Sequence, residues 1–189
     1  MADGPMKSPG KRERVLEAAR ELFLAHGLRG TSMEAIARHA GIAKPTLYAH
    51  FPDKDAVLLA IIEALLAEKL AAFEAAMALD APVAQRVGKA LAAEFQVVAA
   101  ALEGSPHRDE LFAEHKRAAA MMAQSDATVL RKLAETFSAA GVAAPEQLAN
   151  LLLGAAFGLV LRGGSGTQLG ADLELLALRL IEPEVKPGR

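Results

Sequence analysis

The stretch TSMEAIARHAGIAKPTLYAHFPDK, residues 31–54, contains two short helical patterns separated by a glycine. Thr31 and Glu34 have the spacing of a capping box, so we expect a helix to begin at about Ser32. The apolar positions of this helix are followed by Gly41, where a left-handed residue would end it. The first half of the stretch therefore predicts a helix of about two turns closed by a tight turn.

A second short helix is predicted at about Pro45–Phe51. Proline suits a first helical position and pushes Lys44 before it into an extended conformation. Leu47 and Phe51 lie four residues apart, so they share one face and can pack inward. Two helices around a short glycine-containing turn match the helix-turn-helix geometry, in which the second helix enters the major groove of DNA.

These residues also carry a family resemblance. The run LYAHF followed by PDKDAVL, and preceded by TSMEAIARHAGIAKPT, resembles the DNA-binding domain of the TetR/AcrR transcriptional regulators over roughly Arg12 to Leu66. The resemblance implies about nine helices and a homodimer formed by the last two long helices. The family often has a serine where Ala43 stands and a larger residue where Ala49 stands, so we expect fewer base contacts here.

The DNA contacts that we expect divide into base and phosphate contacts. Lys44 and Thr46 are assigned to the groove, and Tyr48, His50 and Lys54 to the phosphates. Lys54 stands in the first turn of the next helix, where free N–H groups favour an anion. Capping alone would explain Thr31, and a phosphate contact would be additional. The predicted DNA-binding residues are Thr31, Lys44, Pro45, Thr46, Tyr48, His50 and Lys54.

Charge is distributed unevenly along the 189 residues. Residues 1–54 hold nine Lys/Arg against six Asp/Glu, a net of +3, and residues 55–189 hold twelve against seventeen, a net of −5. Positive charge in one half is what phosphate neutralisation requires. The chain has no cysteine, and its longest apolar run, 151–161, is shorter than the ~20 residues of a membrane span. We therefore expect a cytoplasmic protein without a membrane partner.

The fold class predicted is all-α. A mobile N-terminal arm and a three-helix helix-turn-helix domain occupy residues 1–53, with the first helix capped near Ser8 and Pro9 and ending at Gly27. A long helix from Lys54 to about Leu79 leads into a helical ligand-binding and dimerisation domain, residues 54–189. Glycine and proline breaks separate the later helices of this bundle, predicted at about 83–103, 107–125, 126–140, 145–162 and 171–181.

Two surfaces of the bundle are candidates for binding. Phe95, His107, Phe112, Met121, Phe137 and Phe157 either line a cavity for a largely apolar effector or, in the case of the apolar ones, fill the core. The small residues Gly154, Ala155 and Gly158 would let another helix approach closely. With Leu161 and Leu176 they form the predicted homodimer interface, unless both helices are buried within one subunit.

An enzyme is the contrasting class. A di-metal helical bundle would need Glu-x-x-His pairs, and none of the five histidines has a glutamate three residues before it. The glycines at 163–166 lack the lysine of a phosphate-binding loop. We expect no enzyme activity, metal or cofactor. The predicted function is a ligand-responsive repressor that binds a pseudo-palindromic operator in double-stranded DNA as a homodimer. The alternative is a nucleoid or architectural factor without effector control.

Overall fold

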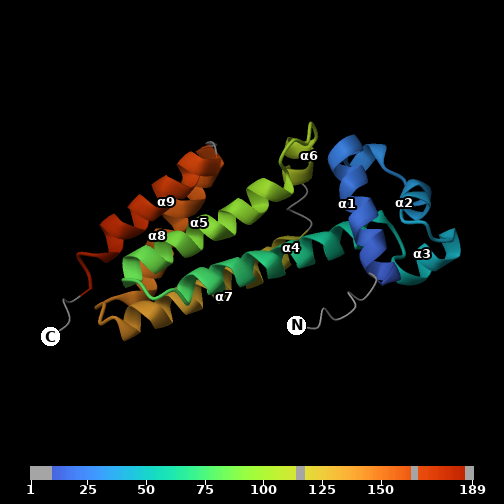
Figure 1. The fold of residues 1–189 in the computed structure, drawn as a ribbon. Coiled ribbons are helices and arrows are strands. Elements are labelled where there is room, and N and C mark those ends of the chain that lie inside the picture. The colour runs from blue at the N-terminus through green and yellow to red at the C-terminus, as the bar shows by residue number, and fades with distance from the viewer. Residues whose placement is uncertain (1–9, 114–117, 163–165, 186–189) are drawn as a thin grey trace, which may run out of the picture. The chain divides into compact units, whose positions relative to one another are not determined.

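The computed structural model describes residues 10–113, 118–162 and 166–185, and within these ranges the regular structure is entirely helical (Figure 1). The all-α fold is therefore confirmed. The helices are α1 (Lys11–Gly30), α2 (Met33–His39), α3 (Lys44–His50), α4 (Lys54–Met77), α5 (Val83–Ala101), α6 (Arg108–Ala113), α7 (Ala119–Ala139), α8 (Pro145–Arg162) and α9 (Gly166–Ile181). Among these described helices, none combines the length and hydrophobicity that crossing a bilayer requires.

The chain divides into two compact units. The head unit comprises Met1–Ala64 and Leu102–Ala118, and the body unit comprises Leu65–Ala101 and Ala119–Arg189. α4 thus begins in the head unit and continues into the body unit, while α6 belongs to the head unit. The functional boundary predicted between residues 53 and 54 stays a prediction.

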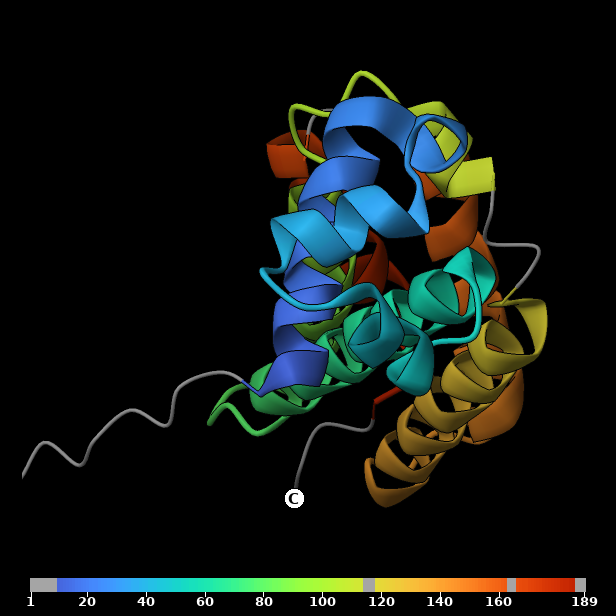
Figure 2. The same cartoon turned by 90° about the vertical axis from the view of Figure 1, so that its right-hand side faces the viewer.

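The head unit has its own hydrophobic core, to which α1 to α4 all contribute. Fully buried side chains come from each of these helices, and Leu111 of α6 packs against the same cluster. Figure 2 shows the helices of this unit grouped around one another, with α2 and α3 joined by their short loop. The largest fully buried members are Val15, Ile36, Leu47 and Val57.

The turn between α2 and α3 has the conformation expected for a helix-turn-helix. Gly41 has φ of +63°, the left-handed region that glycine enters without steric cost. The N–H of Ile42 donates to the carbonyl of Ala37 at 3.0 Å, which closes the end of α2. The cap at the start of α2 was assigned wrongly from the sequence. Ser32, not Thr31, accepts the N–H of Ala35, because Ser32 is the residue that directly precedes the helix.

The body unit is a helical bundle whose core lies among α4, α5, α7, α8 and α9. Figure 1 shows these helices running roughly lengthwise beside one another. α5 and α9 pack closely together at Gly88, where a Cβ atom would come 2.9 Å from the Cα of Glu174. Phe73 and Phe137 are fully buried in this core. The packing of α5 against α9 therefore depends on the absence of a side chain at Gly88.

Several helix boundaries differ from those predicted. α3 begins at Lys44, so Lys44 is helical and Ala43 is the extended residue before the helix. α7 runs from Ala119 through Asp126 to Ala139, across the break expected after residue 125, and the segment predicted at 107–125 is divided between α6 and α7. α9 begins at Gly166, several residues before the predicted start, and α1 extends to Gly30, with a non-helical Gly27. The expected arm, residues 1–9, with the cap at Ser8 and Pro9, lies outside the described residues.

Candidate nucleic-acid interface

α3 divides its side chains between the core and solvent as the sequence predicted. Leu47 is fully buried and Phe51, directly after the helix, is 4% exposed. Tyr48 is 42% exposed. The other candidates on this helix are also accessible: Lys44, Pro45 and His50 are exposed and Thr46 is half-buried. α3 thus presents a polar surface with an aromatic ring in it.

Lys44 is paired with an acid that sequence reasoning missed. Its ammonium forms an ion pair with Glu34 of α2, and both side chains are more than half exposed. The hydrogen bond from Lys44 lowers the pKa of Glu34, and the same bond raises the pKa of Lys44. Both groups are charged at neutral pH, so Lys44 must exchange Glu34 for DNA if it contacts a base or phosphate.

Lys54 bonds to carbonyl groups within the head unit. Its Nζ donates to the carbonyl of Leu28 at 2.5 Å and to that of Thr31 at 2.8 Å. Two of the three ammonium donors are therefore taken by the end of α1 and by Thr31 directly after it. Asp53 caps α4 by accepting the N–H of Ala56 at 2.7 Å. The geometry gives Lys54 a role in holding the head together, and its predicted phosphate contact stays a prediction.

Thr31 is turned away from the surface. Its side chain is buried, and the hydroxyl donates to the carbonyl of Gly27 at 2.8 Å, with the carbonyl of Leu22 at 3.2 Å. The hydroxyl is thus satisfied by the end of α1. This geometry disfavours a contact of Thr31 with DNA, and that contact stays a prediction.

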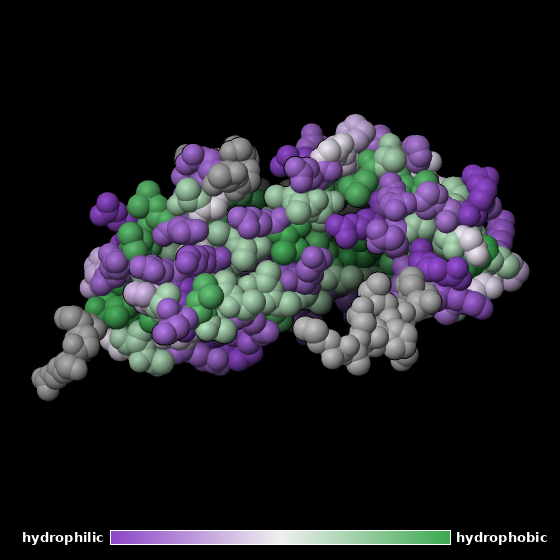
Figure 3. Space-filling model, viewed as in Figure 1, coloured by the Kyte–Doolittle hydropathy of each residue, from purple (hydrophilic) through white to green (hydrophobic). Residues whose placement is uncertain are grey.

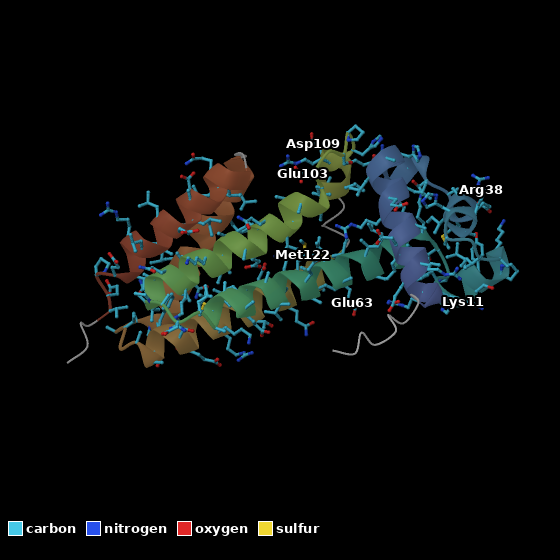
Figure 4. All side chains as sticks on the ribbon, viewed as in Figure 1. Lys11, Arg38, Glu63, Glu103, Asp109 and Met122 are labelled. Atoms are coloured by element: carbon cyan, nitrogen blue, oxygen red, sulfur yellow. The ribbon has the colours of Figure 1, made fainter. Side chains whose placement is uncertain are left out.

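Basic side chains surround α2 and α3 on the head unit. Figure 3 shows hydrophilic residues over much of the visible face of this unit, and Figure 4 shows Lys11 at the start of α1 and Arg38 on α2. The guanidinium of Arg12 stacks on Phe51, 5.5 Å from the ring centre. His39 is paired with Glu21 at 2.5 Å. Positive charge is therefore available beside α3, in part already neutralised by acids.

α6 is attached to α1 by polar contacts. Ser105 donates its hydroxyl to the carbonyl of Leu24 at 2.8 Å, and the N–H of Arg29 donates to Glu110 at 3.1 Å. His107 lies 3.5 Å from the same Glu110 carboxylate. His107, predicted as a ligand contact in the bundle, is thus located in the head unit.

None of the other predicted ligand residues lines the cavity found in the described part of the body unit. Phe137 is fully buried, Met121 is half-buried, and Phe95 forms an edge-to-face pair with Phe157 at 6.2 Å. The side chain of Phe112 lies outside the described part. This cavity of about 470 Å³ lies between α4, α5 and α7. It is lined by Phe73, Glu74, Met77, Ala78, Arg86, Lys132, Glu135, Thr136 and Ala139.

The predicted dimer residues on α8 form an exposed small-residue surface. Gly154, Ala155 and Gly158 are exposed, and a Cβ atom added at either glycine would meet nothing within 4 Å. Leu151 beside them is 59% exposed. Leu176 instead packs partly against the body core, and the side chain of Leu161 lies outside the described residues. This face of α8 is available for another helix.

Comparison with known proteins identifies relatives of the head. Residues 15–61 match the family of bacterial regulatory proteins called tetR. The chain is 36% identical over 92 residues to the HTH-type transcriptional regulator RutR of Escherichia coli K12, covering 44% of this chain and 43% of RutR. The matched stretch thus spans less than half of that relative.

Solved structures extend the likeness to the whole fold. A TetR-family transcriptional regulator from Mesorhizobium loti superposes with a TM-score of 0.71 at 20% identity, covering 93% of this chain and 97% of that one. SmeT, the repressor of the Stenotrophomonas maltophilia multidrug efflux pump SmeDEF, gives 0.65 at 23% identity, covering 94% and 91%. The relatives named here are regulators and not enzymes.

Proposed function

Because the chain belongs to the TetR family of transcriptional regulators, we propose that it is a cytoplasmic, ligand-responsive repressor that binds a pseudo-palindromic operator as a homodimer. The observation that carries the proposal is the polar face of α3, which exposes Lys44, Tyr48 and His50 while Leu47 holds the helix to the core. A helix positioned in this way can enter a major groove.

In the proposed complex, Lys44 and Thr46 contact base edges, and Tyr48 and His50 contact phosphates. Pro45 fixes the start of α3 beside the groove. Glu34 competes with the DNA for the ammonium of Lys44. A base or phosphate of the DNA must therefore bind this ammonium strongly enough to replace the carboxylate of Glu34. This competition favours specific sites over random sequence, since specific base acceptors add to the phosphate attraction.

The proposed dimer uses the exposed face of α8, together with α9. Gly154 and Gly158 leave room for a helix of a second subunit, and exposed Leu151 and Leu175 add apolar surface nearby. A two-fold dimer would present two α3 helices to half-sites about 34–36 Å apart. Operator symmetry should therefore mirror the symmetry of the protein.

An effector bound in the body unit has two continuous routes to the head unit along the chain. α4 runs from one unit into the other, and α5 leads through Ser105 to α6, which bonds to α1. Tilting either route would change the separation of the two α3 helices. Ligand binding and operator binding would then oppose each other by the same factor, typically within ~5–150-fold.

The test is selection of bound sequences from random double-stranded DNA by the full-length purified protein. We expect enrichment of an inverted repeat with half-sites one helical turn apart. Binding without any enriched sequence would instead support the architectural factor, which needs only phosphate contacts. A Lys44→Ala variant selected in parallel should enrich a different repeat. An unchanged repeat would remove Lys44 from the proposed base contacts.

A further inference from the structure

Ionisable side chains from three helices lie inside the body unit. Lys69 of α4 and Glu94 of α5 form an ion pair with Nζ–Oε1 of 2.8 Å, and their side chains are only 9% and 4% exposed. Asp126 of α7 is close enough for the charge of Lys69 to act on its carboxyl group. Removing the charges of Lys69 and Glu94 from water costs free energy, so their burial calls for an explanation.

Lys69 bonds to only one of the two carboxylate oxygens of Glu94. Its second oxygen, Oε2, is buried and has no hydrogen-bond partner in the structure. Buried polar atoms almost always have partners, and a buried ion pair can often be replaced by apolar residues without loss of stability. Stability is therefore a poor explanation of this pair. A role of Oε2 of Glu94 as the hydrogen-bond acceptor for a ligand explains the buried pair better.

The charges around this acceptor favour a cation. When all three groups are ionised, two carboxylates face one ammonium, which leaves a net negative charge. Burial raises the pKa of Asp126, and the charge of Lys69 opposes that effect. A ligand ammonium would stabilise the ionised form of both acids, whereas a ligand carboxylate would face Oε2 of Glu94 and be repelled.

Apolar side chains lie one helical turn along the chain from Lys69 and from Asp126, and the cavity nearby has both apolar and charged lining residues. Fully buried Phe73 follows Lys69 by one turn on α4 and forms part of the wall of the 470 Å³ cavity. Met122, labelled in Figure 4, precedes Asp126 by one turn on α7 and is half-buried. A cavity of this size falls in the range of small-molecule sites. Phe73 is the lining residue that follows Lys69 by one turn, whereas Lys69, Glu94 and Asp126 do not themselves line this cavity.

We propose that Glu94 binds the effector, and that the effector is a small organic cation with an apolar body, whose ammonium donates an N–H to Oε2. The proposal rests on the ligand-responsive function proposed above. Lys69 holds the carboxylate in place, and Asp126 adds a second negative charge. The positively charged donor makes this hydrogen bond stronger than one from an alcohol of the same shape.

The experiment compares three probes of one size, hexylammonium, hexanol and hexanoate, by calorimetric titration of the full-length protein. We expect hexylammonium to bind at least about tenfold more tightly than either other probe. Glu94→Gln should abolish this preference. Glu68→Gln, the matched control on exposed α4 surface beside Lys69, should keep it. Equal binding of the probes, no binding of hexylammonium, or a preference that survives Glu94→Gln would overturn the proposal.

A second variant tests whether the preference for hexylammonium is lost for a reason other than misfolding of Glu94→Gln. The double variant Lys69→Met with Glu94→Met replaces the pair by apolar side chains, and should raise Tm by roughly 2–10 °C while losing the preference for hexylammonium. A lower Tm would show that the pair stabilises the fold and would overturn the proposal.

Selection from random DNA with the same protein separates the proposal of a cationic effector from the proposal of a repressor. An enriched repeat without a preference for the cation rejects only this effector class, and no enrichment rejects the repressor.

Discussion

Replacing Lys54 by methionine separates its two possible roles. Methionine keeps most of the apolar stem but removes the ammonium, and with it the bonds to the carbonyls of Leu28 and Thr31. Each hydrogen bond from a charged donor contributes roughly 1.5–3 kcal/mol, and these carbonyls can be partly rehydrated, so we expect a loss of about 2–4 kcal/mol. In a chain of this size that lowers Tm by roughly 4–16 °C.

The matched control is Lys44→Met, which removes an ammonium from exposed α3 instead. Its only ion pair in the described structure is with exposed Glu34, so stability should change little. The assays are thermal unfolding and the salt dependence of operator binding. Lys44→Met should weaken DNA binding without lowering Tm, and Lys54→Met should lower Tm without changing the slope against log salt.

One result would refute this assignment. If Lys54 contacts a phosphate in each subunit, its loss should reduce the slope by about 0.9 per contact, or about 1.8 for a dimer. A Lys54→Met protein with unchanged Tm and a slope reduced by that amount would show that its ammonium belongs to the DNA interface. The carbonyl bonds would then contribute little to the stability of the head unit.

Three further predictions concern the body unit. Gly88→Ala should cost about 1–3 kcal/mol in unfolding free energy, because its Cβ would be 2.9 Å from Glu174, and an unchanged urea midpoint would contradict this. Gly158→Leu should give a folded monomer by light scattering, whereas Ala67→Leu on exposed α4 should stay dimeric. A dimer in both variants would place the interface elsewhere. Asp126→Asn should leave stability unchanged below the ordinary pKa of 3.8 and raise it at higher pH. Burial raises the native pKa, so the wild type loses stability as the carboxyl ionises, and parallel pH profiles would refute this.

The short helices of the head could be predicted because their ends are marked locally. Gly41 supplies the left-handed turn and Pro45 the first turn of α3, and both signals need only neighbouring residues. Leu47 and Phe51 followed from a spacing of four. The cap of α2 was misplaced because Thr31 and Ser32 are both good capping residues, and the choice depends on the end of α1, which accepts the Thr31 hydroxyl.

Contacts between distant residues could not be read in this way. The carbonyl partners of Lys54 belong to the last turn of α1 and to the residue after that helix, and a sequence does not show where backbone carbonyls point. The pair of Lys69 and Glu94 did leave a signal, since each charge interrupts an apolar helical face. That signal identifies a buried charge but not its partner, which depends on how α4 and α5 face each other.

The position of this pair along the chain connects the effector site with the head. Lys69 follows soon after Ala64, where α4 enters the body unit, and Glu94 precedes Ala101, where α5 leaves it. The ion pair thus joins the two segments that continue into the head unit. A cation bound to Oε2 would share the charge of Glu94 with Lys69, which would weaken the attraction between α4 and α5 and so alter both routes to α3 at once. By reciprocity, operator DNA should weaken hexylammonium binding by the factor with which hexylammonium weakens operator binding. The Lys69→Met, Glu94→Met protein should bind operator and ignore the probe, because its α4 and α5 no longer depend on a charge that a ligand can remove.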